Sequence, residues 1–506
     1  GMDRRQFLGT AAAAAGAALI PSGAHGDGRR RLAMPPLRDT RATGRLALTA
    51  RPGTVRFLGR AGSVTAGFDQ DYLGPTVVMR DGPLGVTVDN ALGETLTVHW
   101  HGLLVPGEHD GGPHSAIAPG GRWTVDMHLA QRPATVWYHS HTHGATARHV
   151  YFGLAGVIHQ TDGRDDDRGL PNRYGIDDLT LVVQDRRFDA DGRLIYAPEP
   201  TDILNGFEAG RVLVNGQADA VAVVPPGIVR LRFVNGSNAR FYSLHFDDGR
   251  PMHLVATDGG FLPRPRALEF LRLAPGERAE VLVDFAAGGP TPTLLSSRGG
   301  RMRVLPFAVD GREPVRIVRV PDRLDVDPLP DDAPDARLRR FSLTMGGGSS
   351  GQSRGTAPPP LSHAAQAHAH HGHAGHGGGT HGAIVGGGPE VIGTRMNDFA
   401  INGRPHDMRR VDFEVPLGAT ERWIVTGGGG VEHPFHVHGV HFRVMRIGGI
   451  PPRAEESGWK DTVGLAGETE LLVRFDHRAG ADAPYMYHCH ILEHEDAGMM
   501  GQFTVV

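Results

Sequence analysis

The chain has 506 residues, which is too many for one hydrophobic core, so its length predicts two to four domains. The formal net charge is −4 with histidine neutral, and this near balance gives no broad electrostatic attraction to nucleic acid or to a membrane surface. The 72 glycines and 37 prolines favour many short strands over long helices, and the single cysteine, Cys489, excludes an intrachain disulfide.

An export signal is predicted over residues 1–24. Arg4 and Arg5 precede an alanine-rich apolar run that ends near Ile20. A twin arginine before a short apolar region is typical of a bacterial Tat signal, and the alternative is a chance Arg-Arg pair before a signal anchor. The run is too short to span a bilayer comfortably, so we expect a periplasmic or extracellular protein without a membrane anchor.

Three stretches of the chain resemble one another, over residues 82–102, 225–246 and 415–439. Each contains a turn, an alternating strand, a short polar loop and another strand. A second recurring element follows each stretch, and the copy at 274–278 leads directly into a further alternating strand. The repetition predicts three copies of one antiparallel β-domain.

The spacing of the repeats indicates the domain boundaries and an insertion. The distance from Gly227 to the equivalent Gly418 exceeds that from Gly85 to Gly227 by 49 residues. A tract rich in Gly, Ser, Ala, Pro and His at about 346–388 accounts for the excess, and its composition predicts a mobile loop. The predicted domains cover residues 40–168, 170–325 and 337–506, and the third contains the insert.

Histidine is concentrated in four short motifs, one of which surrounds the only cysteine. The motifs are His99-Trp100-His101, His139-Ser140-His141, His433-Pro434-Phe435-His436-Val437-His438 and His488-Cys489-His490, and His494 and Met499 follow the last. Most single histidines in β-proteins are surface or hydrogen-bonded residues, but chance does not readily produce four His-x-His pairs. We interpret the motifs as metal ligands.

Strand geometry explains the two-residue spacing of these histidines. Side chains at positions i and i+2 of a strand lie on one face about 6–7 Å apart, so two imidazoles can bind one metal ion or two neighbouring ions. In the last motif His488 and His490 share a face and Cys489 points the other way. Cys489 is therefore aimed at one metal ion and its neighbours at others, which provides a covalent path between two sites.

Ligand softness favours copper as the metal. Two histidines, a thiolate and a weak thioether form the blue-copper arrangement, and His433, Cys489, His494 and Met499 supply this set. Zinc also accepts cysteine and histidine, but it has no redox role and leaves the other eight paired histidines unexplained.

With these motifs the chain resembles the multicopper oxidases, which include laccases, bilirubin oxidases, ascorbate oxidase and, with the greatest likeness, the bacterial copper-efflux oxidases. The resemblance runs from His99 through Asp110-Gly111-Gly112 to Gly153, and it resumes at residues 458–462 and 488–500. It implies an all-β fold of three consecutive cupredoxin-like Greek-key β-sandwich domains and a cofactor of four copper ions. It also implies that the middle domain, with a lone His245, holds no copper ligand.

The family pattern implies a role for each ligand position. His433, Cys489 and His494 would bind the type 1 copper, with Met499 axial, and His99 and His436 would bind the type 2 copper. The type 3 pair would be held by His101, His139, His141, His438, His488 and His490. The trinuclear cluster is then expected between the first and third domains, because both supply its ligands. His143 and His441 match no ligand position.

The resemblance also implies a mechanism. Single electrons would enter at the type 1 copper and pass through Cys489 to the trinuclear cluster, where four electrons and four protons convert O₂ to two waters. Asp110 and Glu495 are the expected catalytic proton carriers, and the alternatives are a turn aspartate and a surface glutamate. Asp461 could equally be a structural hydrogen-bond acceptor.

Two reductants are compatible with these motifs. A laccase-like enzyme would oxidise phenols and aromatic amines, whereas a cuprous oxidase would convert Cu(I) to Cu(II) in copper homeostasis. Copper-efflux oxidases use a methionine-rich insert and a carboxylate–methionine substrate site, but residues 429–432 contain no Asp or Met and the insert contains seven histidines instead. We therefore predict the laccase-like activity, with cuprous oxidase as the alternative. The insert either gathers copper or is a low-complexity tract.

A third class consists of exported relatives that have lost copper and act as structural or division-associated proteins. This chain keeps all twelve ligand positions, which argues against that class. The expected partners are O₂ and a small reducing substrate, namely a phenol, an aromatic amine or Cu(I). We expect a monomer that binds neither nucleic acid nor a membrane.

Overall fold

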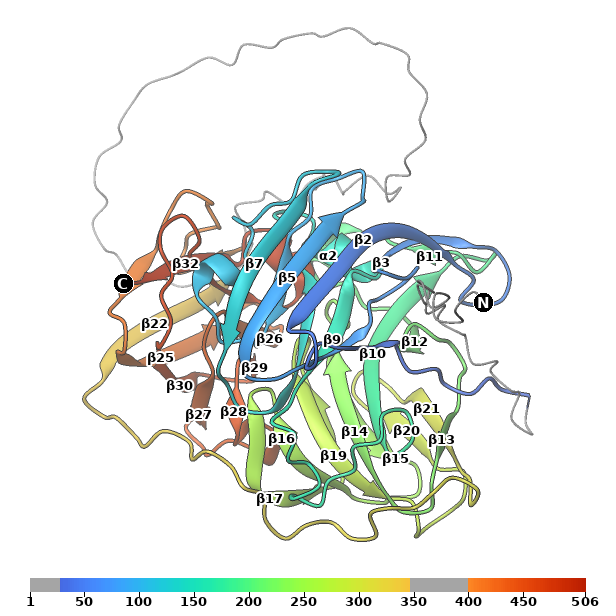
Figure 1. The fold of residues 1–506 in the computed structure, drawn as a ribbon. Coiled ribbons are helices and arrows are strands. Elements are labelled where there is room, and N and C mark those ends of the chain that lie inside the picture. Colours follow the sequence, from blue (N-terminus) through green and yellow to red (C-terminus); the bar gives the residue numbers. More distant parts are fainter. Residues whose placement is uncertain (1–27, 346–398) are drawn as a thin grey trace, which may run out of the picture.

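A computed structural model describes residues 28–345 and 399–506 (Figure 1). The predicted export signal and the histidine-rich insert lie outside the described residues. Within the described ranges no helix is longer than six residues, and strands form six sheets, which confirms the predicted all-β class. No helix in this part of the chain is long and apolar enough to cross a membrane.

The first segment, residues 37–160, forms two sheets. One sheet has the order β1 (Leu37–Asp39), β4 (Thr76–Met79), β9 (Ala155–Gln160), β8 (Ala134–Ser140) and β6 (Val98–His101). The other has the order β3 (Ser63–Phe68), β2 (Arg45–Val55), β5 (Gly82–Asn90) and β7 (Arg122–Leu129). Two short helices, α1 (Gly107–Asp110) and α2 (Thr146–Tyr151), lie in the connections of this segment.

The second segment, residues 178–309, also forms two sheets. One contains β11 (Leu194–Ile195), β10 (Asp178–Phe188), β14 (Ile228–Asn235), β19 (Arg278–Asp284), β16 (Met252–Thr257) and β17 (Gly260–Leu268), with β12 (Arg211–Val214) also paired to β10. The other contains β13 (Ala222–Val224), β21 (Met302–Val309), β20 (Thr293–Ser296), β15 (Tyr242–Phe246) and β18 (Leu271–Leu273). Helix α3 (Pro200–Asn205) precedes β12.

The third segment, residues 337–345 and 399–506, repeats this plan. One sheet contains β23 (Ala400–Ile401), β22 (Arg337–Thr344), β25 (Thr420–Gly427), β30 (Thr469–Arg474), β27 (Phe442–Ile447) and β28 (Trp459–Lys460). The other contains β24 (Phe413–Val415), β32 (Met500–Val505), β31 (Tyr485–Cys489), β26 (His433–Val437) and β29 (Thr462–Leu465). The 3-10 turn η1 (Ala454–Glu456) precedes β28, and helix α4 (Leu492–Asp496) precedes β32. The three segments form neighbouring lobes (Figure 1), and the exact domain boundaries stay a prediction.

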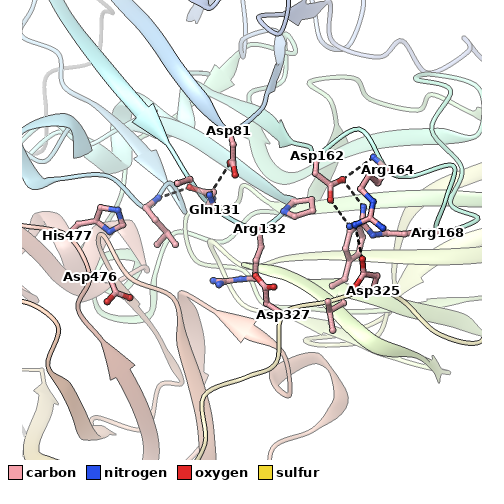
Figure 2. Close-up of a pocket in the computed structure, with 15 residues that line it drawn as sticks. Asp81, Gln131, Arg132, Asp162, Arg164, Arg168, Asp325, Asp327, Asp476 and His477 are labelled. Atoms are coloured by element: carbon pink, nitrogen blue, oxygen red, sulfur yellow. Dashed lines mark hydrogen bonds and ion pairs between the residues drawn. The ribbon is translucent and has the colours of Figure 1, made fainter.

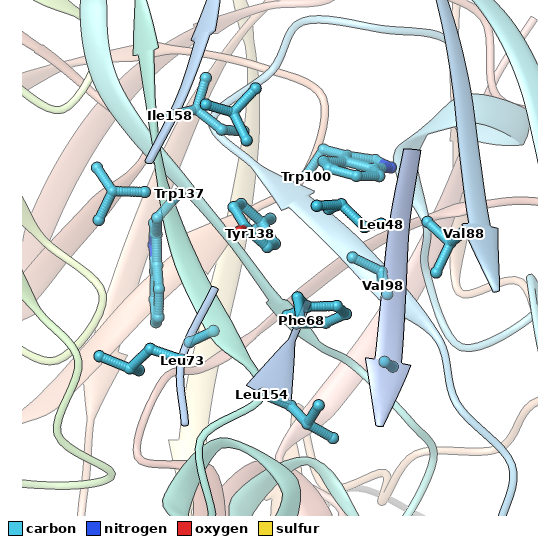
Figure 3. Packing of buried hydrophobic residues seen from close by; sticks show 14 of the residues in the cluster. Leu48, Phe68, Leu73, Val88, Val98, Trp100, Trp137, Tyr138, Leu154 and Ile158 are labelled. Carbon is cyan, nitrogen blue, oxygen red and sulfur yellow. The ribbon is translucent and has the colours of Figure 1, made fainter. Parts of the chain in front are cut away.

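Alternation along β6 separates the core of the first segment from the site. Val98 and Trp100 belong to the apolar core, where they pack with Tyr138 and other buried side chains (Figure 3). Successive side chains of a strand point to opposite faces, so His99 and His101 are directed to the other face. That face is covered by the third segment, and all of these side chains are buried.

Glu94, in the connection between β5 and β6, contacts helix α2 through its carboxylate. One carboxylate oxygen of Glu94 accepts a hydrogen bond from Arg148 Nη1 at 3.0 Å, and the other lies 3.2 Å from His149 Nε2. Burial alone raises the pKa of Glu94, but the bonds to Arg148 and His149 outweigh it and lower this pKa to about 2. An acid with a lowered pKa in the folded state stabilises the fold above its unfolded pKa and loses this contribution as the pH falls.

We therefore expect Glu94→Gln to lower the free energy of unfolding at pH 7 by about 1 kcal/mol. The difference from the wild type should shrink as the pH falls from about 5 to about 2, because the wild-type carboxylate becomes protonated there. Urea unfolding followed by circular dichroism across this range measures it. A difference that stays constant down to the lowest pH would contradict the assignment.

Candidate metal centres

One cluster of potential ligands contains the only cysteine. It combines His433 from β26, Cys489 from β31 and His494 from α4, and all three side chains are buried. Cys489 Sγ lies 3.4 Å from His433 Nδ1 and 3.6 Å from His494 Nδ1. Met499 is buried as well, and its backbone carbonyl accepts the N–H of Cys489 at 3.1 Å. The structure thus brings together the residues that the sequence suggested for a blue-copper site.

Hydrogen bonds orient the two imidazoles of this cluster. His433 Nε2 donates to the carbonyl of Gly428 at 2.9 Å, and His494 Nε2 donates to the carbonyl of Leu204 at 3.0 Å. The Nδ1 atoms therefore carry lone pairs, and these atoms face each other at 3.3 Å. Two nitrogen ligands that each lie about 2.0 Å from one ion at a tetrahedral angle are roughly 3.3 Å apart.

The thiol of Cys489 also fits a metal ligand. Burial raises the pKa of the Cys489 thiol well above its ordinary value. A thiolate at this position therefore needs a bound cation to stabilise its charge. The same burial makes Cys489 unsuited to act as an exposed nucleophile.

Eight further histidines converge between the first and third segments, all of them buried. They are His99, His101, His139, His141, His436, His438, His488 and His490. The facing nitrogen atoms are 3.3 Å apart in the pairs His99–His436, His101–His139 and His141–His488, and 3.2 Å apart in His438–His488. These distances equal the spacing expected for ligands of a shared ion.

The eight histidines fall into groups whose donor atoms lie within 4.8 Å of one another. The groups are His101, His139 and His490; His141, His438 and His488; and His99, His436 and His438. In three of the four His-x-His pairs, such as His488 and His490, the two histidines belong to different groups, whereas His436 and His438 share one. The His-x-His spacing therefore directs neighbouring imidazoles to separate positions of one cluster.

His99 and His436 present the clearest sign of a cation. His99 Nδ1 donates to the carbonyl of Asp110, and His436 Nδ1 donates to the carbonyl of Asp461, each at 2.9 Å. Both Nε2 atoms are left without a proton, yet they face each other at 3.3 Å in a buried site. Two facing lone pairs repel and cannot form a hydrogen bond, whereas a cation between them is stabilised by both.

The other histidines are held in the form that binds metals. Burial, followed by neighbouring imidazoles, lowers the pKa of His141 and of His488 well below its ordinary value, and burial likewise lowers the pKa of His490. Neutral imidazole is the ligand form. Both ring nitrogens of His490 are buried without a hydrogen-bond partner. An unsatisfied buried polar group costs about 1–3 kcal/mol, and a bound ion removes this cost.

Asp110 and Glu495 both contact this cluster. Asp110 ends α1, is buried, and accepts a hydrogen bond on Oδ2 from His438 Nδ1 at 2.7 Å. Glu495 on α4 places Oε2 3.2 Å from His488 Nδ1 and Oε1 3.4 Å from His141 Nε2. Burial, with Asp496 and Glu493 nearby, raises the pKa of Glu495 well above its ordinary value.

Glycine is required where the chain passes Asp110. Gly111 has φ +78°, and a Cβ at this position would lie 1.7 Å from the carbonyl oxygen of Val98. Any other residue would push α1 away from β6 and would move Asp110 away from His99. The Asp110-Gly111-Gly112 motif therefore positions the carboxylate as well as making a turn.

Sequence reasoning missed Arg278, which links the second segment to the cluster. Arg278 is fully buried, and its Nη1 and Nη2 donate to Asp461 Oδ1 and Oδ2 at 2.8 and 2.5 Å. Asp461 Oδ1 in turn accepts from His101 Nε2 at 3.0 Å, which leaves His101 Nδ1 free to face His139. Burial opposes ionisation of Asp461, but Arg278 and His101 outweigh it and hold its pKa well below the usual range.

Asp461 is therefore a hydrogen-bond acceptor that orients ligands, which was one of the two interpretations of the sequence. Two further buried ion pairs extend the network, since Lys460 Nζ lies 2.9 Å from Asp258 and 3.0 Å from Glu277. One signal could have revealed Arg278, because it begins an alternating strand and directly follows a repeated turn, a position where a charge requires a partner. No candidate metal group in the described residues includes a residue of the second segment.

His143 and His441, which match no ligand position, lie in different surroundings. His441 is buried, donates from Nε2 to the carbonyl of Gly102 at 2.9 Å, and accepts from Arg132 Nη2 at 2.8 Å. It therefore joins the first and third segments beside the ligand His101. His143 is exposed and lies near His406.

A cavity of about 530 Å³ lies where loops of the three segments meet (Figure 2). Its lining includes Arg164 and Arg168, which pair with Asp325 and Asp162 at 2.8 and 2.6 Å. None of the twelve suggested ligands lines it. The cavity is thus separate from the histidine clusters, and most of its arginine charge is neutralised locally.

Comparison with protein families agrees with this geometry. Three models described as multicopper oxidase match residues 49–163, 177–291 and 389–506. Among solved structures, the chain is similar to CueO from Ochrobactrum sp., described as a bacterial laccase-like multi-copper oxidase with activity towards lignin model compounds. That structure is 38% identical, with a TM-score of 0.81 over 94% of this chain and 100% of that chain. McoA from Aquifex aeolicus is 28% identical, with a TM-score of 0.76 over 94% and 99%.

Curated relatives carry a different name. The cell division protein FtsP of Dickeya dadantii (strain 3937) is 34% identical over 522 residues, which cover 99% of this chain and 98% of that protein. The cell division protein FtsP of Escherichia coli (strain K12) is 32% identical over 510 residues, which cover 100% and 99%.

These relatives contradict the predicted reductant. They match the whole chain and are named as cell division proteins, neither as laccases nor as cuprous oxidases. The assignment to a laccase-like oxidase of phenols and aromatic amines, with a cuprous oxidase as the alternative, is therefore wrong. The physical reason is that the histidine motifs indicate metal ligands and do not identify the electron donor.

The family itself follows from the three matched models, from the full-length relatives and from the cupredoxin-like sheets of the similar structures. The chain belongs to the multicopper oxidase family.

Proposed function

We propose that this protein is a copper-dependent oxidoreductase that takes single electrons from a reductant and uses O₂ as the acceptor. The observation that carries the proposal is the pair of Nε2 lone pairs of His99 and His436, which face each other at 3.3 Å in a buried site. A protein without a bound cation gains nothing from this arrangement, which repels in the absence of an ion.

Each cluster suits a distinct copper ion. His433, Cys489, His494 and Met499 would hold the type 1 ion, because thiolate and imidazole are the ligands of blue copper. His99 and His436 would hold the type 2 ion. The two groups that would hold the type 3 pair are His101, His139 and His490, and His141, His438 and His488. When bound, four such ions would supply the one-electron steps that reduce O₂ to two waters.

The chain connects the two sites through one strand. Cys489 in β31 contacts His433 and His494, whereas His488 and His490 on either side of it belong to the eight-histidine cluster. In addition, His488 Nδ1 donates to the carbonyl of Cys489 at 2.9 Å. With copper bound, the covalent segment and this hydrogen bond would offer an electron a short path from the Cys489 cluster to the other cluster.

Two carboxyl groups are placed to supply protons. Glu495, whose pKa is raised by burial, lies beside His141 and His488, and Asp110 lies beside His438. Asp110 Oδ1 is buried without a hydrogen-bond partner and is available to a water or a proton. We propose that these residues hold and transfer the protons that O₂ reduction consumes.

We also propose that the protein is exported through the Tat pathway and that it is a monomer. Its three domains would cover residues 40–168, 170–325 and 337–506. A Tat signal over residues 1–24 would direct the protein across the inner membrane after folding, so that copper ligands are already arranged.

The experiment uses ferrocyanide, an inorganic one-electron donor that assumes nothing about the natural reductant. Copper-loaded protein should consume one O₂ for about every four ferrocyanide ions oxidised, without releasing hydrogen peroxide. An oxygen electrode, ferricyanide absorbance and a peroxidase assay measure the three quantities. Two ferrocyanide ions per O₂ together with peroxide, or no O₂ consumption by a fully copper-loaded sample, would refute the proposal.

Glu495→Gln is expected to slow O₂ reduction by roughly 100-fold, because a positioned acid contributes about 10²–10⁴ to such steps. Its copper content should match that of the wild type, since Glu495 is not a ligand. Glu493→Gln is the matched control on the same helix, because Glu493 faces Tyr196 and Asn238 instead of the histidines. Equal rates for Glu495→Gln and the wild type would remove Glu495 from the proton path.

A second candidate function is a role in cell division that needs no copper turnover. The full-length similarity to proteins named FtsP favours it. Copper content separates the candidates, because a purely structural role does not require four ions per chain.

A further inference from the structure

Three histidines outside the twelve candidate ligands lie together between the first and third segments. They are His114, His143 and His406. The ring centroids of His143 and His406 are 5.5 Å apart. This separation falls in the range of neighbouring imidazoles in the candidate metal clusters, both those that suit a shared ion, such as His99–His436 at 5.6 Å, and those in adjacent groups, such as His488–His490 at 5.6 Å. The two rings therefore have the spacing of neighbouring candidate ligands elsewhere in the chain.

The ring nitrogens of His406 are available to bind a metal ion. Both of its ring nitrogens are buried and have no hydrogen-bond partner among the residues that the structure describes. Its backbone N–H donates to the carbonyl of Gly498 at 2.9 Å, which anchors the residue. Burial, with His143 nearby, lowers the pKa of His406 to about 4, so the ring is in the neutral form that binds metals.

A carboxylate and an arginine both lie beside these histidines. Asp412 is close enough to His406 to act on it electrostatically as a negative charge. The Asp412 carboxylate is fixed on Oδ2 by hydrogen bonds from Tyr487 Oη and from the backbone N–H of Gln502, each at 3.0 Å. Its Oδ1 accepts from Arg410 Nε at 2.7 Å, so its charge is balanced locally and the proposed site depends on the imidazoles. Gln502 Oε1 lies 2.9 Å from His114 Nε2, which holds the third imidazole beside the pair. His143 is exposed, so an ion can enter from solvent.

We propose that His143 and His406 bind one additional divalent transition-metal ion, with Cu²⁺ preferred and with water and His114 completing its coordination. Imidazole ligands favour Cu²⁺ over the other divalent first-row ions. The three rings do not converge within 4.8 Å as the groups described above do. The ion would therefore have two firm protein ligands. It would bind more weakly and exchange more readily than the ions in the buried clusters.

The site joins two segments of the fold. His143 follows β8 in the first segment, and His406 follows β23 in the third. A metal ion here links these segments at the surface, separately from the buried cluster. Binding stabilises the folded state in proportion to the logarithm of the ion concentration above its dissociation constant.

The test titrates Cu²⁺ into protein whose tightly bound copper has been measured after dialysis. Isothermal titration calorimetry and electron paramagnetic resonance should detect one further ion with nitrogen ligands in the wild type. In His406→Ala and His143→Ala the affinity for this ion should fall by roughly 100-fold or more, since loss of even a supporting group costs 10–100-fold. His128→Ala, at an exposed position of β7, is the matched control and should bind the ion like the wild type.

The variants should keep the tightly bound copper of the wild type, which shows that they fold. His406→Gln gives a second variant of similar volume if His406→Ala unfolds. Equal affinity for the further ion in the wild type and in both His406 variants would overturn the proposal, as would a wild type that binds no ion beyond the tightly held copper. Because Zn²⁺ and Ni²⁺ titrations give the same comparison, the outcome does not depend on oxidase activity.

Discussion

Cys489→Ser is expected to abolish the intense blue absorption and the oxidation of any donor, while about three copper ions per chain remain. A serine hydroxyl is a hard, weak ligand that does not replace a thiolate for copper. Cys489 Sγ lies 3.4 and 3.6 Å from the Nδ1 atoms of His433 and His494, so its loss removes the sulfur of the cluster and the entry to the strand path. Absorption spectra, metal analysis and oxygen uptake measure the three effects.

Met499→Leu is the control for this variant, because it keeps the thiolate and both imidazoles. It should retain blue absorption and copper, and only the reduction potential should change. Retained blue colour or donor oxidation in Cys489→Ser would contradict the assignment of Cys489.

Arg278→Met should cause the largest loss of stability among single changes around the cluster. Arg278 is fully buried, donates two hydrogen bonds to Asp461 and lies 3.7 Å from Asp258. Its removal leaves the buried Asp461 carboxylate without its main counter-charge, which costs about 3–5 kcal/mol. Calorimetric unfolding of the metal-free protein measures the loss, which should appear as a lower midpoint temperature.

The same variant should also weaken copper binding. Without Arg278 the pKa of Asp461 should rise. A protonated Asp461 is a poorer acceptor for the hydrogen bond that orients His101. Arg409→Met is the control, since its side chain is 91% exposed and pairs only with Asp407 at 3.5 Å. The control should change stability by no more than about 0.5 kcal/mol. An equally small effect of Arg278→Met would contradict the role of the network.

The clusters could be predicted because their signal is local. Strand alternation places His99 and His101 on the face opposite Val98 and Trp100, and the same rule separates Cys489 from its neighbours. The structure brings all eight histidines and the Cys489 cluster together as the motifs suggested. The separation of the histidines into groups depended on packing between segments, which no local pattern contains.

Long-range partners could not be predicted in the same way. Arg278 and Asp461 are 183 residues apart in the chain, and only the packing of the second segment on the third reveals their contact. The sequence left two roles possible for Asp461, proton carrier and structural hydrogen-bond acceptor. Its acceptor role depends on His101 and Arg278 together, and their contacts are visible only in the folded chain.

The reductant was predicted wrongly for a related reason. The conclusion rested on the absence of Asp and Met from residues 429–432. Absence of one donor site does not identify another donor.

Copper analysis of the purified full-length protein, combined with its electron paramagnetic resonance spectrum, tests the central claim most directly. The account predicts about four tightly bound copper ions per chain, with one type 1 and one type 2 signal and a silent type 3 pair. A colourless protein that binds at most one copper ion after exposure to excess Cu²⁺ would contradict it and would favour a role without redox chemistry.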